Sequence, residues 1–174
     1  MQKGLNQFVE RSALSACRVI VLMALSTSMR AATTVLPSRI VDENAPASIG
    51  IEQKQPGSTI VRVRLLNASR EPLRIYEDFL PWRKRYSIAV FAVPTQSGAR
   101  FLQAVYPVDD FGSGKITLAP GREYTGEIDL AERFPDLKRV LSTDDVFAFW
   151  TYELKTVDRK SLGRQFGGLL LRRK

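Results

Sequence analysis

The sequence predicts an all-β protein, an antiparallel β-sandwich of about eight strands preceded by an N-terminal signal peptide. Three observations support this prediction. From Ile49 onward, short apolar or alternating runs are separated by turn residues, a pattern typical of sandwiches and barrels. No stretch of this part has the length and spacing of a long amphipathic helix. The first thirty residues differ, because they combine basic residues with a short apolar run.

Residues 1–31 are predicted to be a secretory signal peptide. Three basic residues precede the apolar run 19–25, and small residues follow it, the usual order in such a signal. The run is shorter than the roughly 20 apolar residues that span a bilayer. An interfacial N-terminal helix and a misassigned start codon are the alternatives. Residues 32–48 are expected to form an irregular lead-in and residues 49–174 the β-sandwich domain, in the periplasm or outside the cell.

The first strands follow from apolar spacing and from the turns between them. A strand at 49–55 is stopped by a Pro-Gly turn. The run 59–67 has apolar residues at every second position with arginines between them, as in a half-buried strand. A polar turn then leads to a strand at 73–76. The run 86–93 is apolar on both faces, which predicts a central strand.

The C-terminal half continues the same pattern. Pro135 interrupts the segment 131–140 and limits it to a short helical turn. The run 146–155 is the strongest strand, with one continuous apolar face and two phenylalanines on the other. Further strands are expected at 100–108, 116–118, 123–130 and 167–171. The arrangement is expected to be of immunoglobulin-like type, although small barrels share this pattern.

Catalysis is not expected, because the chain has no histidine and its one cysteine, Cys17, lies in the predicted signal peptide. Ser-His-Asp and Cys-His catalysis are thereby excluded, as are the usual His/Cys zinc sites. We therefore predict a protein that is not an enzyme and holds no cofactor or metal. Four adjacent acidic pairs are interpreted as turns or strand ends, because neighbours on a strand point in opposite directions: 42–43, 77–78, 109–110 and 144–145. A carboxylate-only enzyme and a calcium loop at 109–114 are the alternatives.

The formal charge of +8 is concentrated at the two ends of the chain. Residues 1–31 carry four basic and one acidic side chain, and residues 155–174 carry seven basic and one acidic. The body between them is close to neutral, so we expect no nucleic-acid partner. A basic terminus is most often solvated; the alternative is a weak contact with an anionic membrane surface through Arg172, Arg173 and Lys174.

The segment 79–86 places three aromatic and three basic residues between two predicted strands. Trp, Tyr and Arg dominate protein-binding hot spots, because Trp and Tyr bury a large area with few rotatable bonds and Arg forms several hydrogen bonds. The candidate partner-binding residues are therefore Trp82, Arg83, Arg85 and Tyr86. In the alternative interpretation, the aromatic residues of this segment fold back and cap the open end of the sandwich.

Several segments occur in an order that resembles known proteins. They are the polar turn 67–73, the apolar strand 88–93, the turn 118–122 and the segment 127–130 followed by Phe134. Over 49–154 this order resembles the immunoglobulin-like domain that precedes the catalytic domain of deuterolysin-type metallopeptidases, and also the BsuPI-type proteinase inhibitors. The HExxH helix of the peptidases has no counterpart, since histidine is absent. The resemblance therefore implies the non-catalytic half only.

Together these features predict an exported, non-catalytic binding protein. We expect an inhibitor or an immunity-type protein that occludes a periplasmic or secreted partner, an enzyme or a toxin. The alternative is an envelope-associated structural module that uses its basic C-terminal end on anionic surfaces.

Overall fold

Eight antiparallel strands make up nearly all of the regular structure in the part of the chain that the computed structural model describes. That part comprises residues 45–84, 87–96, 100–105, 112 and 114–174, which belong to one unit, Leu36–Lys174. The strands are β1 (Ala47–Gln53), β2 (Ile60–Asn67), β3 (Leu73–Tyr76), β4 (Ile88–Pro94), β5 (Lys115–Leu118), β6 (Glu123–Asp129), β7 (Val146–Lys155) and β8 (Ser161–Leu171). The predicted all-β, antiparallel class is thus confirmed.

Helical structure in the described residues is limited to short turns. These are the 3₁₀ turns η1 (Glu77–Phe79) and η2 (Leu130–Glu132) and the single-turn helix α2 (Leu137–Val140), so the expected helical turn near Pro135 is confirmed. No helix in the described ranges is long and apolar enough to cross a membrane. The predicted signal peptide 1–31 lies outside the described residues, as does most of the predicted lead-in.

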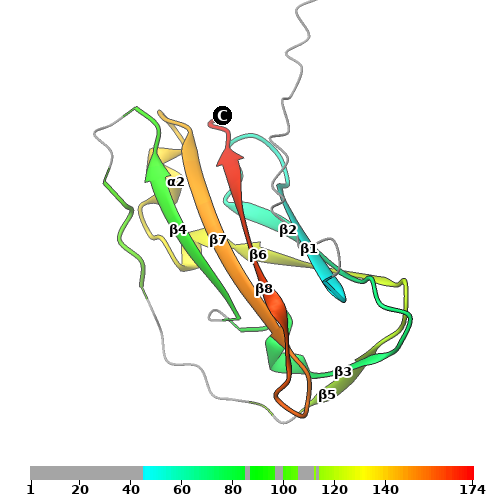
Figure 1. Cartoon of the computed structure of the whole chain (residues 1–174). Helices are drawn as coiled ribbons and strands as arrows, with labels where there is room; N and C mark the ends of the chain where they lie inside the picture. Colours follow the sequence, from blue (N-terminus) through cyan, green and yellow to red (C-terminus); the bar gives the residue numbers. More distant parts are fainter. Residues whose placement is uncertain (1–44, 85–86, 97–99, 106–111, 113) are drawn as a thin grey trace, which may run out of the picture. The chain divides into compact units, whose positions relative to one another are not determined.

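The strands form three small sheets, in the orders β1-β2-β6, β3-β5 and β4-β7-β8. Figure 1 shows β4, β7 and β8 in front of β1, β2 and β6, with the β3-β5 pair at one end. The buried side chain of Asn67 holds the junction between β2 and β3. Its Nδ2 donates to the carbonyl oxygens of Glu71 and Leu118, both at 2.9 Å, and so satisfies one backbone acceptor in the turn before β3 and one at the end of β5.

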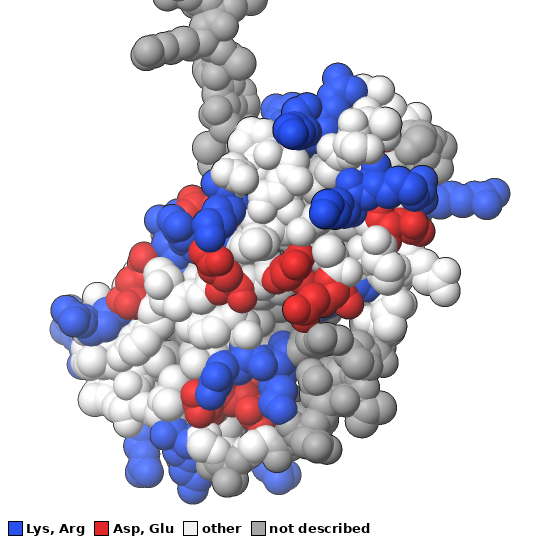
Figure 2. Space-filling view, turned by 180° about the vertical axis from the view of Figure 1, so that it is seen from behind, with Lys and Arg blue, Asp and Glu red and all other residues white. Residues whose placement is uncertain are grey.

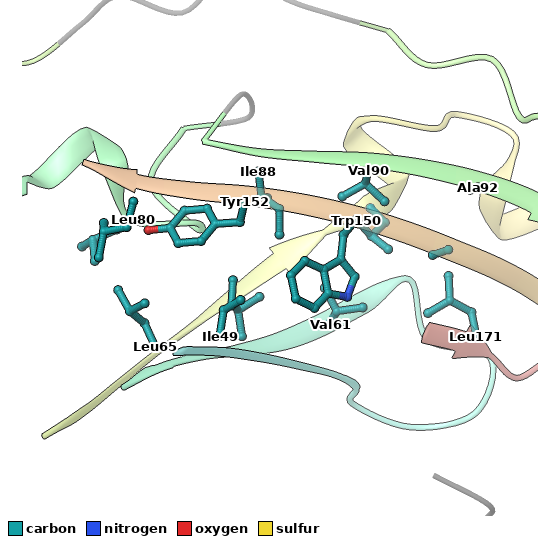
Figure 3. Close-up of a cluster of buried hydrophobic side chains, with 14 of the residues drawn as sticks. Ile49, Val61, Leu65, Leu80, Ile88, Val90, Ala92, Trp150, Tyr152 and Leu171 are labelled. Atoms are coloured by element: carbon teal, nitrogen blue, oxygen red, sulfur yellow. The ribbon is translucent and has the colours of Figure 1, made fainter. Parts of the chain in front are cut away.

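The core lies between the two three-stranded sheets. Period-two alternation decides which residues enter it, as β7 shows, where every second residue is buried. Figure 3 shows Trp150 and Tyr152 of β7 on the same side of their sheet as Ile88 and Val90 of β4, facing Val61 of β2. The inward residues of β7 are those predicted from sequence: Val146, Ala148, Trp150, Tyr152 and Leu154.

Two glutamine side chains join the edges of β1 and β8. Gln165 is buried in β8; its Nε2 donates to the Ala47 carbonyl at 2.6 Å, and its Oε1 accepts from the Ile49 amide at 2.9 Å. At the other end of β1, Gln53 holds the backbone of Arg172 in the same way, at 3.0 and 2.8 Å. These side-chain amides replace ladder bonds that the two strands do not make with each other.

The prediction that 86–93 forms a central strand is wrong, because among the described strands β4 pairs with β7 alone and lies at a sheet edge. Its last residue, Pro94, suits an edge position, since proline has no amide proton for a second neighbour. Ile88, Val90 and Ala92 are buried, whereas Ala89 and Phe91 are exposed. The apolar residues on the second face of β4 therefore lie on an exposed surface and not in a second buried layer.

The strand predicted at 100–108 is absent from its described part, residues 100–105. In this described part, the Leu102 amide donates to the Ala92 carbonyl of β4 at 2.7 Å. The Val105 amide donates to the Arg133 carbonyl, outside that strand, at 2.8 Å. The last strand is longer than the predicted 167–171, because β8 begins at Ser161. Its first half is polar, so apolar spacing alone does not reveal it.

Candidate partner-binding site

Trp82 lies flat against the backbone of β6, next to Gly126. A Cβ built on Gly126 would lie 2.1 Å from Cγ of the Trp82 ring, so the indole occupies the space that any side chain at this position would need. The ring is half-buried and packs against the main core. This geometry favours the packing interpretation of Trp82, and it anchors the segment that follows η1 to the sheet.

Arg83 follows the anchored tryptophan and reaches toward solvent. Its guanidinium pairs with the carboxylate of Glu77 in η1, and its side chain stays 52% exposed. Its amide donates to the Leu80 carbonyl at 3.1 Å, which closes a turn. Arg85 and Tyr86, the other two candidates, lie outside the described residues.

A polar cleft of about 260 Å³ lies beside this turn. Trp82, Arg83 and Lys84 line the cleft from one segment. The other segment contributes Arg133 and three acidic residues, Glu127, Asp129 and Glu132, of which Glu127 also pairs with Lys54 at 3.1 Å. Small-molecule sites are usually larger, roughly 300–1,000 Å³, and mainly apolar. A cleft that combines a cationic rim with an acidic wall instead suits a polar side chain of a macromolecular partner.

The described acidic pairs have structural partners. Asp78 accepts a hydrogen bond from the Gly112 amide, and Asp144 accepts from the Thr95 hydroxyl at 2.8 Å and the Gln96 amide at 3.0 Å. No group of three or more Asp, Glu, His or Cys side chains suited to a metal occurs in the described residues. The pairs at 42–43 and 109–110, and with the latter most of the predicted calcium loop, lie outside them.

The basic C-terminal end is packed onto the domain. Arg172 Nη1 lies 3.1 Å from Oδ2 of Asp145, whose Oδ1 accepts from the amide of Arg173 at 2.8 Å. The Arg173 guanidinium donates to the Thr143 carbonyl at 2.9 Å, and Lys174 lies against Gly57. Each of the two guanidinium groups makes one of these contacts within the chain, and the membrane contact expected of this end stays a prediction.

The two sheets present different outer faces. Arg62 and Arg64 on β2 pair with Glu52 on β1 at 3.7 and 3.1 Å, and Figure 2 shows acidic and basic side chains interspersed on the side opposite to that of Figure 1. The outer face of β4-β7-β8 carries exposed phenylalanines instead. Sequence reasoning missed that surface. The run 86–93 is apolar on both faces, and this pattern could have indicated an exposed apolar face as well as a central strand.

Comparison with known proteins assigns no family. No protein-family model matches the chain, and no curated protein matches it. Among solved structures, the chain is similar to the one described as the "Putative ApaA Protein from Bordetella pertussis", at 15% identity and a TM-score of 0.36, over 72% of this chain and 90% of that chain. The similarity is a distant one between β-rich folds.

Proposed function

We propose that this protein is an exported, non-catalytic binding protein that recognises a protein partner, as an inhibitor or immunity-type protein does. For the two facing sheets we propose the immunoglobulin-like sandwich class, with the non-catalytic domains and inhibitors named above as its nearest functional parallels. The chain has no histidine, which leaves it without the side chain that usually moves protons near neutral pH. A surface function is the simplest consequence.

The observation that carries the proposal is the exposed guanidinium of Arg83 beside a cleft with an acidic wall. Loops held by a rigid scaffold are common binding elements, because little order is lost when they engage a partner. Trp82 provides that rigidity by packing on Gly126. Arg83 can then exchange its ion pair with Glu77 for one with a partner carboxylate, while the cleft accepts a partner's basic side chain.

Immunoprecipitation of the untagged full chain from cells tests the proposal. The C-terminal end is unsuited to a tag, because Lys174 lies on Gly57. We expect one protein to co-precipitate in stoichiometric amount, and Arg83→Ala to reduce the recovered amount about tenfold, the effect of removing a hot-spot arginine.

Arg62→Ala is the matched control, since its side chain is 48% exposed and also pairs with a glutamate. It should recover the partner as the unmodified protein does. Absence of any stoichiometric partner, or equal recovery with Arg83→Ala, would contradict the proposal. Retention of the protein inside the cell would contradict its export.

A further inference from the structure

The outer face of β4-β7-β8 carries three uncharged rows with exposed aromatic side chains, which the described residues leave uncovered. Three strands contribute one residue each to every row across the sheet. The central row is Phe91, Phe149 and Gly168, and the rows beside it end in Leu170 and Phe166. Of the nine positions in these three rows, Thr151 alone carries a polar side chain: Ala89, Phe91, Val93, Phe147, Phe149, Thr151, Phe166, Gly168 and Leu170.

Aromatic rings make this face continuous. Phe91 contacts Phe101 edge to face, with ring centroids 6.4 Å apart, and Phe147 contacts Phe149 at 4.5 Å. A Cβ on Gly168 would come within 2.7 Å of the Phe147 ring, so this ring covers the glycine. The exposed fractions of the most accessible members are 50% for Phe91, 67% for Phe101, 47% for Phe149 and 47% for Phe166.

Several charges next to these rows, on β7, β8 and their ends, pair within the chain. Glu153 lies 3.2 Å from Arg164 and 3.8 Å from Lys155, and Asp145 pairs with Arg172 at 3.1 Å. Hydrogen bonds from Ser161 and Arg164 lower the pKa of Glu153. An anionic bilayer would have to compete with these internal pairs for the cations, whereas another uncharged face would leave them intact.

We infer that the occupant of this face is a second copy of the same chain, packed sheet against sheet across a two-fold axis. Sheets of the same twist stack with their strands about 30° apart and a spacing of about 10 Å, and a second copy presents the same twist and the same uncharged centre. In such an isologous interface each phenylalanine contributes contact area once from each copy. This inference is independent of the proposed role of Arg83.

The available area predicts a reversible dimer. An aromatic side chain can bury about 150–250 Å², so a half-exposed phenylalanine offers roughly 100 Å². The four exposed phenylalanines and their partly exposed neighbours then contribute about 500 Å² per copy, or about 1,000 Å² in total. That value lies at the lower end of specific interfaces. We therefore expect dissociation in the micromolar range.

Sedimentation velocity of the full chain from about 5 to 500 μM, a range chosen around a micromolar dissociation constant, tests the inference. The weight-average mass should rise from one chain toward two. Phe149→Thr and Phe91→Thr keep a strand-forming residue and should each weaken association at least tenfold. Arg62→Thr, on the outer face of the other sheet, is the matched control and should associate as the unmodified protein does. Thermal unfolding verifies that each variant is folded.

Three results would overturn the inference. The first is the mass of a single chain at every concentration. The second is a dimer that neither phenylalanine variant weakens, which would place the contact elsewhere. The third is a monomer that floats with phosphatidylglycerol vesicles and loses this binding in Phe149→Thr, which would assign the face to a membrane.

Discussion

Replacement of Gly126 by alanine tests how the segment after η1 is held. The new Cβ would lie 2.1 Å from Cγ of Trp82, far inside van der Waals contact, so the indole has to leave β6. A half-buried tryptophan keeps about 100 Å² out of water, which at about 25 cal/mol/Å² is worth about 2.5 kcal/mol. Alanine gains about 0.5–1 kcal/mol over glycine in a strand. The free energy of unfolding should fall by about 2 kcal/mol, which lowers Tm by roughly 6–8 °C.

Urea unfolding followed by tryptophan fluorescence measures this cost. Gly50→Ala in β1 is the matched control, because nothing lies within 4 Å of a Cβ built there; it should leave stability unchanged or raise it slightly. Gly126→Ala should also shift emission to longer wavelength, since Trp82 becomes solvated. In a Trp82→Ala background the same glycine replacement should cost nothing, because the clashing ring is gone. Equal costs of Gly126→Ala with and without Trp82 would refute the reasoning.

Three further predictions concern buried and terminal contacts. Gln165→Ala should cost about 2–4 kcal/mol in urea unfolding, because it leaves an amide and a carbonyl of β1 without partners; a cost below 1 kcal/mol would contradict the role of this side chain. Tyr152 donates to the Phe79 carbonyl at 2.8 Å, and burial raises the pKa of its phenol above 10.0. Above pH 10 the unfolded chain therefore loses a proton that the native state keeps, and stability falls by up to about 1.4 kcal/mol per pH unit. Tyr152→Phe should lack this component, so its stability relative to the unmodified protein should rise between pH 9 and 11; parallel profiles would contradict the assignment. Asp145→Ala should cost at most about 1 kcal/mol yet make the bond after Arg172 more sensitive to trypsin; unchanged cleavage would show that this carboxylate does not hold the terminus.

Period-two spacing was sufficient to predict most strands, and the inward face of β2 and β7. The alternation in β2 and β7 separates core from surface residues, because successive side chains on a strand point in opposite directions. Turn residues such as the Pro-Gly pair at 120–121 marked where strands end, since Gly121 has φ +64°. Both kinds of information lie within about ten residues of chain, so they can be read from sequence.

Pairing partners could not be read in this way. The run 86–93 has the apolar pattern of a central strand, yet β4 lies at an edge, because the number of neighbours depends on distant segments. The polar half of β8 is a strand because it pairs with β7, and its Gln165 also bonds to the backbone of β1, more than a hundred residues away. For the candidate site, sequence reasoning named Arg83 as a partner-binding residue, which stays a prediction, whereas Gly126 as the support of Trp82 required the fold.

The sequence by itself determined the all-β class, the approximate strand positions and the absence of histidine chemistry, since these follow from local spacing and residue type. Tertiary structure decided which strands lie at edges, that Trp82 packs on a glycine, that the basic terminus is held by Asp145, and that one sheet keeps an aromatic face in solvent. The physical reason is that burial and pairing are properties of contacts between segments distant in the chain. No local pattern distinguishes an apolar face that is covered from one that is left open.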